Sequence, residues 1–217
     1  MRNWRRTSAR LIAGLLLTAT ATGAQDSAEP PLDSATALVV ERIIDGAAAD
    51  GLPIAPLRAK AIEGARRGAS NEMILRVVAG FAVRLRVARA ILRSSTSDPE
   101  LIAVAGALTA GVSKPAAESL VAVVRAQPRP MPVTVPFVVA TDLSARGVPA
   151  DSALSAVQAV LRRNGNETDL WTLRAAVARD IASGGDPLDA LMVRSGFSRA
   201  HQPPPRSDGT RPPPGTP

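Results

Sequence analysis

The chain has 217 residues, a formal net charge of +7, no cysteine, no tyrosine and one histidine. Without cysteine no disulfide stabilises the fold, so an apolar core must hold it together. The one histidine, His201, lies in a proline-rich terminal segment, which excludes most hydrolase triads and zinc sites from the folded part. Aromatic residues make up only 2% of the chain, which argues against a stacking platform for sugars or bases.

Residues 1–24 predict a secretory signal peptide, because a charged start (MRNWRR) precedes an apolar run (LIAGLLL) and then small residues. We expect cleavage near Ala24 and an exported protein, either periplasmic or secreted. The apolar run is shorter than the roughly 20 residues of a membrane-spanning helix, although a retained anchor remains an alternative. Arg5-Arg6 resembles a twin-arginine signal, but polar residues follow the pair, so we expect the general secretory route.

Export changes the charge balance of the protein. The 26 basic residues of the chain fall to 22 without residues 1–24, against 19 acidic residues, which leaves a net charge of +3. A charge this small is not the electrostatic footprint of a nucleic-acid-binding protein. We therefore expect no nucleic-acid partner.

Helical periodicity fills the middle of the chain, so we predict an all-α fold, either a multi-helix bundle or an irregular array of helix pairs. The clearest segment, 71–93, is the predicted central helix, because its apolar residues recur at spacings of three and four. Val83 and Val87 fall opposite this stripe, so we expect the helix to pack on two faces. The residues of the stripe are Ile74, Val77, Val78, Phe81, Leu85, Ala88 and Leu92.

Glycines followed by a proline or a small polar residue punctuate the helical pattern. Such a glycine ends one helix in the left-handed conformation, and the residues after it start the next. The last three junction glycines are 36 and 37 residues apart, which predicts a helix-pair repeat. The stretch 51–70 accordingly reads as one helix, with Pro53 and Pro56 in its first turn. The junction glycines are Gly51, Gly68, Gly111, Gly147 and Gly184, and the predicted N-caps are Ser70, Ser97, Ser113, Asn166 and Asp186.

Prolines divide the chain at residues 127–135, where a regular helix is forbidden. We expect this linker to join two helical halves, 33–126 and 136–198, the second opened by Pro136. A short edge strand through Val133 to Val135 is the alternative. The segments 25–32 and 199–217 lack apolar periodicity and are predicted to be disordered. The second is expected to be a solvated tail, or alternatively a spacer or a ligand for a proline-reading groove.

A carboxylate enzyme is one functional alternative. Glu118-Ser119 resembles a pair found in lytic transglycosylases, and this resemblance implies glycan cleavage with Glu118 as the general acid. The chain departs from that family, because it lacks the glutamine-containing loop and the tyrosine. Glu118 is also explained by a place near a helix N-terminus, where a carboxylate favours the helix dipole.

Arg86, Arg89 and Arg93 form a candidate anion-binding site, because they share one flank of the predicted central helix. Such a flank can meet an anionic lipid, a cell-wall polymer or an acidic protein, or can simply be solvated. Trp171 is expected in the core.

We interpret the chain as an exported, non-catalytic interaction or scaffold module of the cell envelope, without a cofactor or a metal. Its expected partner is an envelope protein or polymer, with a membrane surface less favoured. The carboxylate enzyme and the arginine-mediated binder of anionic surfaces are the alternatives.

Overall fold

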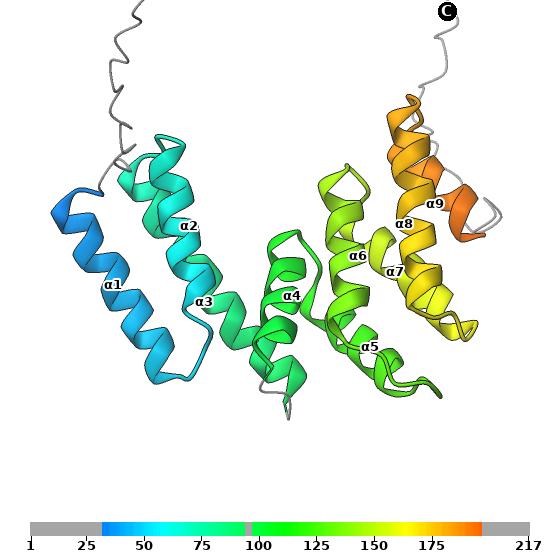
Figure 1. Cartoon of the computed structure of the whole chain (residues 1–217), viewed down its shortest axis with the longest axis horizontal. Helices are drawn as coiled ribbons and strands as arrows, with labels where there is room; N and C mark the ends of the chain where they lie inside the picture. The colour runs from blue at the N-terminus through cyan, green and yellow to red at the C-terminus, as the bar shows by residue number, and fades with distance from the viewer. Residues whose placement is uncertain (1–31, 94–96, 197–217) are drawn as a thin grey trace, which may run out of the picture.

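The computed structural model describes residues 32–93 and 97–196, and within these ranges the fold is entirely helical, as predicted (Figure 1). The predicted signal peptide and the segment 199–217 lie outside the described residues. Nine helices make up the described part: α1 Ser34–Ala49, α2 Ala55–Arg66, α3 Asn71–Leu92, α4 Asp98–Thr109, α5 Lys114–Arg125, α6 Thr134–Ala145, α7 Ala150–Arg162, α8 Glu167–Ala182 and α9 Pro187–Ser195.

The last six helices form an array of three pairs, α4 with α5, α6 with α7 and α8 with α9. The first helices of the pairs, α4, α6 and α8, pack side by side in one row, which we call the first row. The second helices, α5, α7 and α9, form a second row that packs against the first. The long helix α3 packs on both α4 and α5, and α1 and α2 pack on α3. Each element thus contacts mainly its neighbours, as in a helical solenoid.

The turn inside each pair explains the spacing of the junction glycines. Gly147 follows α6 with a φ of +95°, a left-handed conformation that a side chain would strain. The next amide, of Val148, donates to the carbonyl of Leu143 at 3.2 Å and closes the helix. The same bond ends α4, from Val112 to Ala107 at 3.0 Å, and a matching one ends α8. The three glycines therefore mark the same turn in three successive pairs.

The predicted helix starts are well reproduced. Ser70, Ser113 and Asp186 are N-caps whose side chains accept backbone N–H groups of the first turn. Asn166 caps α8 in a reciprocal arrangement with Asp169, a capping box. These caps mark the starts of α3, α5, α8 and α9. Ser97 is the N-cap residue of α4, as predicted, but its side chain does not make the cap hydrogen bond.

The central helix is confirmed as α3, but its predicted packing on two faces is wrong in part. Six of the seven stripe residues are buried, whereas Val77 is 42% exposed. On the opposite side Val87 packs against the core, while Val83 is 56% exposed. The helices around α3 cover its outer side only in part.

Two proline-based predictions need correction. The helix α2 begins at Ala55 with Pro56 in its first turn, so Pro53 lies before the helix rather than in it. Thr134 and Val135 are helical, so α6 begins two residues before Pro136 and the alternative of an edge strand is wrong. The rows continue across the proline-rich segment, because α4 packs on α6 and α5 on α7.

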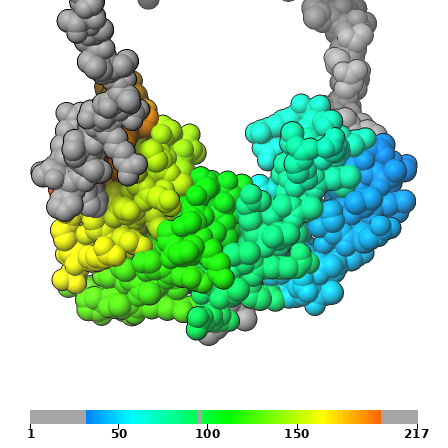
Figure 2. All heavy atoms as spheres, turned by 180° about the vertical axis from the view of Figure 1, so that it is seen from behind, coloured from blue at the N-terminus to red at the C-terminus, as the bar shows by residue number. Residues whose placement is uncertain are grey.

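The described part of the molecule is a curved slab rather than a ball. Figure 2 shows its surface hollowed at one edge, between the α2–α3 end in cyan and the α6–α7 region in yellow-green. Among the described residues no helix has the length and apolarity that a membrane span requires.

Candidate interaction surface

The predicted anion-binding arginines are separated by the structure into two groups. Arg86 Nε lies 2.6 Å from Asp50 Oδ2, and the guanidinium of Arg89 donates to the backbone carbonyls of Asp50 and Gly51. Both side chains thus fasten α3 to the end of α1, where exposed helix carbonyls need donors. Their cationic groups have partners within the fold.

Arg93 is placed differently. It is the exposed C-cap residue of α3, with a φ of 54°, and its backbone N–H donates to the carbonyl of Arg89 at 2.8 Å. Its side chain makes no hydrogen bond or ion pair within the described ranges. Of the three arginines, it is the one whose guanidinium has no partner among the residues that the structure describes. Anion binding at this flank remains a prediction.

Glu118 is exposed on α5. Its carboxylate lies 3.7 Å from Lys114 Nζ one helical turn earlier, and 47% of its side chain is exposed. A general acid for glycan cleavage is held in a buried site that raises its pKa. This position removes the physical basis for assigning that role to Glu118.

The first row instead presents a repeated apolar feature. Ile102, Val138 and Trp171 are each the fifth residue of their helix, in α4, α6 and α8. They are 36%, 39% and 36% exposed, although they are large and apolar. Because each first-row helix is covered by its row neighbours and by the second row, its remaining side faces outward. We call the surface that carries these three residues the first-row face.

Trp171 corrects the sequence interpretation, which placed it in the core. On α8 the buried side chains are those of Leu170, Leu173 and Val177. Trp171 lies about 100° around the helix from Leu170 and so leaves this stripe. Its indole Nε1 donates to Glu167 Oε1 at 3.2 Å. The ring is therefore oriented by a hydrogen bond while part of it stays in contact with solvent.

A charged cluster joins α8 to α6 beside the indole. Arg174 donates from Nε to Asp142 Oδ2 at 2.8 Å and from Nη2 to Oδ1 at 3.1 Å, and Arg146 Nε lies 2.8 Å from Oδ2. The Arg174 guanidinium is also 5.8 Å from the centre of the Trp171 ring. Burial opposes the charge of Asp142, but the hydrogen bonds and charges of Arg174 and Arg146 outweigh it and lower the pKa of this carboxyl.

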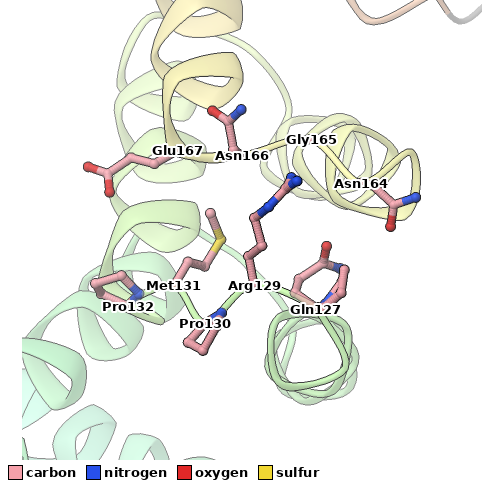
Figure 3. Close-up of a pocket in the computed structure, with 10 residues that line it drawn as sticks. Gln127, Arg129, Pro130, Met131, Pro132, Asn164, Gly165, Asn166 and Glu167 are labelled. Carbon is pink, nitrogen blue, oxygen red and sulfur yellow. The ribbon is translucent and has the colours of Figure 1, made fainter.

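A pocket of about 210 Å³ adjoins the first-row face. Its walls are the segment 127–132 that precedes α6 and the turn 164–167 between α7 and α8. Figure 3 shows Arg129 and Met131 extending from the first wall toward the second. Glu167 lines the pocket and also holds the indole of Trp171, so pocket and face are continuous. We call this cavity the proline pocket.

The wall formed by the turn depends on a close backbone approach. The Asn164 residue adopts a φ of +59°, and the amide of Gly165 donates to the carbonyl of Val160 at 3.0 Å. A Cβ on Gly165 would lie 2.7 Å from that carbonyl oxygen and 2.5 Å from a Val160 methyl carbon. Only glycine fits this position.

Within the described ranges, no group of three or more His, Cys, Asp or Glu side chains is arranged to hold a metal ion. Comparison of the chain with protein-family models, with curated proteins and with solved structures gave no match.

Proposed function

We propose that the chain is an exported, non-catalytic interaction module of the cell envelope, and that the first-row face binds its partner polypeptide. The observation that carries the proposal is the recurrence of an exposed large apolar residue at the same position of α4, α6 and α8. Solvated helix surfaces carry such residues singly, whereas a row of them across neighbouring helices is typical of an interaction site.

The array geometry supports the same role. Stacked helix pairs build an extended surface whose length grows with each pair, and proteins of this architecture bind extended partners along it. Trp171 is the natural anchor, because a half-exposed indole held by Glu167 and flanked by Arg174 offers apolar area at a small entropic cost. The export prediction gives the compartment of the partner.

Site-specific photo-crosslinking in the producing cell tests the proposal. A photoreactive residue in place of Val138 reports on the first-row face, and one in place of the exposed Ala122 of α5 is the matched control on the second row. We expect a reproducible protein adduct from position 138 and none from position 122. Equal adducts from both positions, or none from either, would count against the first-row face as a binding surface.

A further inference from the structure

The proline-rich end of the chain begins beside the proline pocket. The carbonyl oxygen of Ser195, the last residue of α9, accepts a hydrogen bond from Arg163 Nη2 at 3.0 Å. Arg163 directly precedes Asn164, which lines the pocket. The 21 residues that follow Gly196 therefore leave the described fold close to the turn that forms one pocket wall.

The length of this segment is sufficient to reach the pocket. Its first proline triplet, 203–205, starts seven residues after Gly196. A fully extended chain spans at most about 3.3–3.6 Å per residue, so seven residues reach up to roughly 23–25 Å. The helix α8 has 16 residues and is itself about 24 Å long. The triplet can therefore reach the N-terminal end of α8, where the proline pocket lies, from its starting point beside the turn 164–167.

The chemistry of the segment matches the pocket. Two proline triplets, 203–205 and 212–214, each stand next to an arginine, Arg206 and Arg211. Proline-rich peptides are recognised by grooves with an aromatic wall, because the preformed extended backbone loses little entropy on binding. Met131 and the prolines of the segment 127–132 form an apolar wall of the pocket. The aromatic ring beside it is Trp171, whose indole donates to the pocket residue Glu167, and the Glu167 carboxylate offers a partner for an arginine. Arg129, on the opposite wall, complements Asp208 between the triplets.

We propose that residues 203–214 of the chain bind to its own proline pocket and cover the Trp171 end of the first-row face. Attachment through a short linker gives a segment an effective concentration on the order of millimolar, so that a weak contact suffices. This inference rests on the proposed function in one respect, since the covered surface is the one assigned to the partner. The segment would then compete with that partner.

Fluorescence of Trp171 tests the proposal in the full chain. The chain has two tryptophans, Trp4 and Trp171, so a Trp4→Phe background isolates the signal from α8. We compare the full chain with a variant that ends at Arg199, and measure quenching of Trp171 by acrylamide. Removal of the segment is expected to raise quenching roughly twofold, because a docked segment excludes water and solutes from the ring.

A synthetic peptide of residues 200–217, added to the shortened chain, supplies the second measurement. Saturable recovery of protection is expected, and Glu167→Gln should weaken the peptide several-fold. Glu118→Gln, a matched change on the exposed face of α5, should leave peptide binding unchanged. Circular dichroism of each variant confirms that the helices are intact.

Equal quenching with and without the segment would overturn the proposal, as would protection that disappears when the full chain is diluted. Failure here is distinguishable from failure of the proposed function. Photo-crosslinking from position 138 in the chain that ends at Arg199 examines the binding surface with the segment removed. Loss of docking leaves that adduct in place, whereas a wrong assignment of the surface abolishes it.

Discussion

Arg174 of α8 donates hydrogen bonds to both carboxylate oxygens of Asp142 on α6, at 2.8 and 3.1 Å, and so joins two neighbouring helices of the first row. The fork of an arginine matches a carboxylate in two parallel bonds, which a lysine cannot reproduce. Both side chains are about one third exposed or less, at 34% and 27%. The pair therefore stabilises the row more than a fully solvated surface ion pair would.

Replacing Arg174 by lysine is expected to lower the free energy of unfolding by about 1 kcal/mol, because the second bond to Asp142 is lost. Urea unfolding followed by circular dichroism measures the change. Arg67→Lys is the matched control, since Arg67 pairs with Glu63 within a single helix, one turn apart, and its side chain is 76% exposed. A loss of equal size in both variants would contradict a special role for the fork.

The same carboxylate predicts a pH dependence. The folded-state pKa of Asp142 lies below its ordinary value of 3.8, so the charged cluster stabilises the fold above that pH. The stabilisation is lost as the pH falls through the folded-state pKa, where Asp142 takes up a proton. The difference in unfolding free energy between the native chain and Asp142→Asn should therefore be constant near neutral pH and shrink below pH 3.8. A difference that grows as the pH falls would contradict a lowered pKa of Asp142 in the folded state.

Alanine substitutions at Arg89 and Arg93 are expected to affect the stability of the protein differently. Arg89→Ala should destabilise the protein by about 1–3 kcal/mol, because the carbonyls of Asp50 and Gly51 lose a charged donor. Arg93→Ala, on the same helix, should leave stability unchanged. Sedimentation with anionic vesicles at low and high salt examines the separate question of anion binding. Association that survives Arg93→Ala undiminished would remove that residue from the site.

Substitution of Gly165 tests the close backbone approach that shapes one wall of the proline pocket. Gly165→Ala should cost about 1–3 kcal/mol, because the new methyl group meets backbone atoms of Val160 that cannot move aside. Gly106→Ala is the control inside α4, where a Cβ meets nothing within 4 Å. That change should stabilise the helix by about 0.5–1 kcal/mol. Thermal unfolding compares the two, and similar melting temperatures would be inconsistent with the close approach at Gly165.

The helices and their repeat could be predicted from the sequence because residues close together in the chain determine where each helix begins and ends. Gly147 and Asn166 specify a helix end and a helix start without reference to the rest of the chain. The first-row face was missed for a physical reason. The helices of Ile102 and Val138 are apolar on nearly all sides, so periodicity gave no contrast between the buried and exposed faces.

The exposure of Trp171 was predictable from the sequence, whereas the contacts of Arg89 were not. The stripe of α8 formed by Leu170, Leu173 and Val177 excludes Trp171 by its angle, so the exposed position of the indole was present in the pattern. The engagement of Arg89 with the end of α1 joins residues 38 positions apart. No local rule predicts that contact, and the proline pocket likewise depends on two turns that only the array brings together.

The most direct test of the binding surface is the yield of the photo-crosslink from position 138 in a Trp171→Ser background. Trp171 is partly exposed and outside the core, so the variant should keep its helical content and nearly all of its stability. If the first-row face binds the partner with Trp171 as anchor, the adduct should fall several-fold. An undiminished adduct in a folded Trp171→Ser variant would contradict the account.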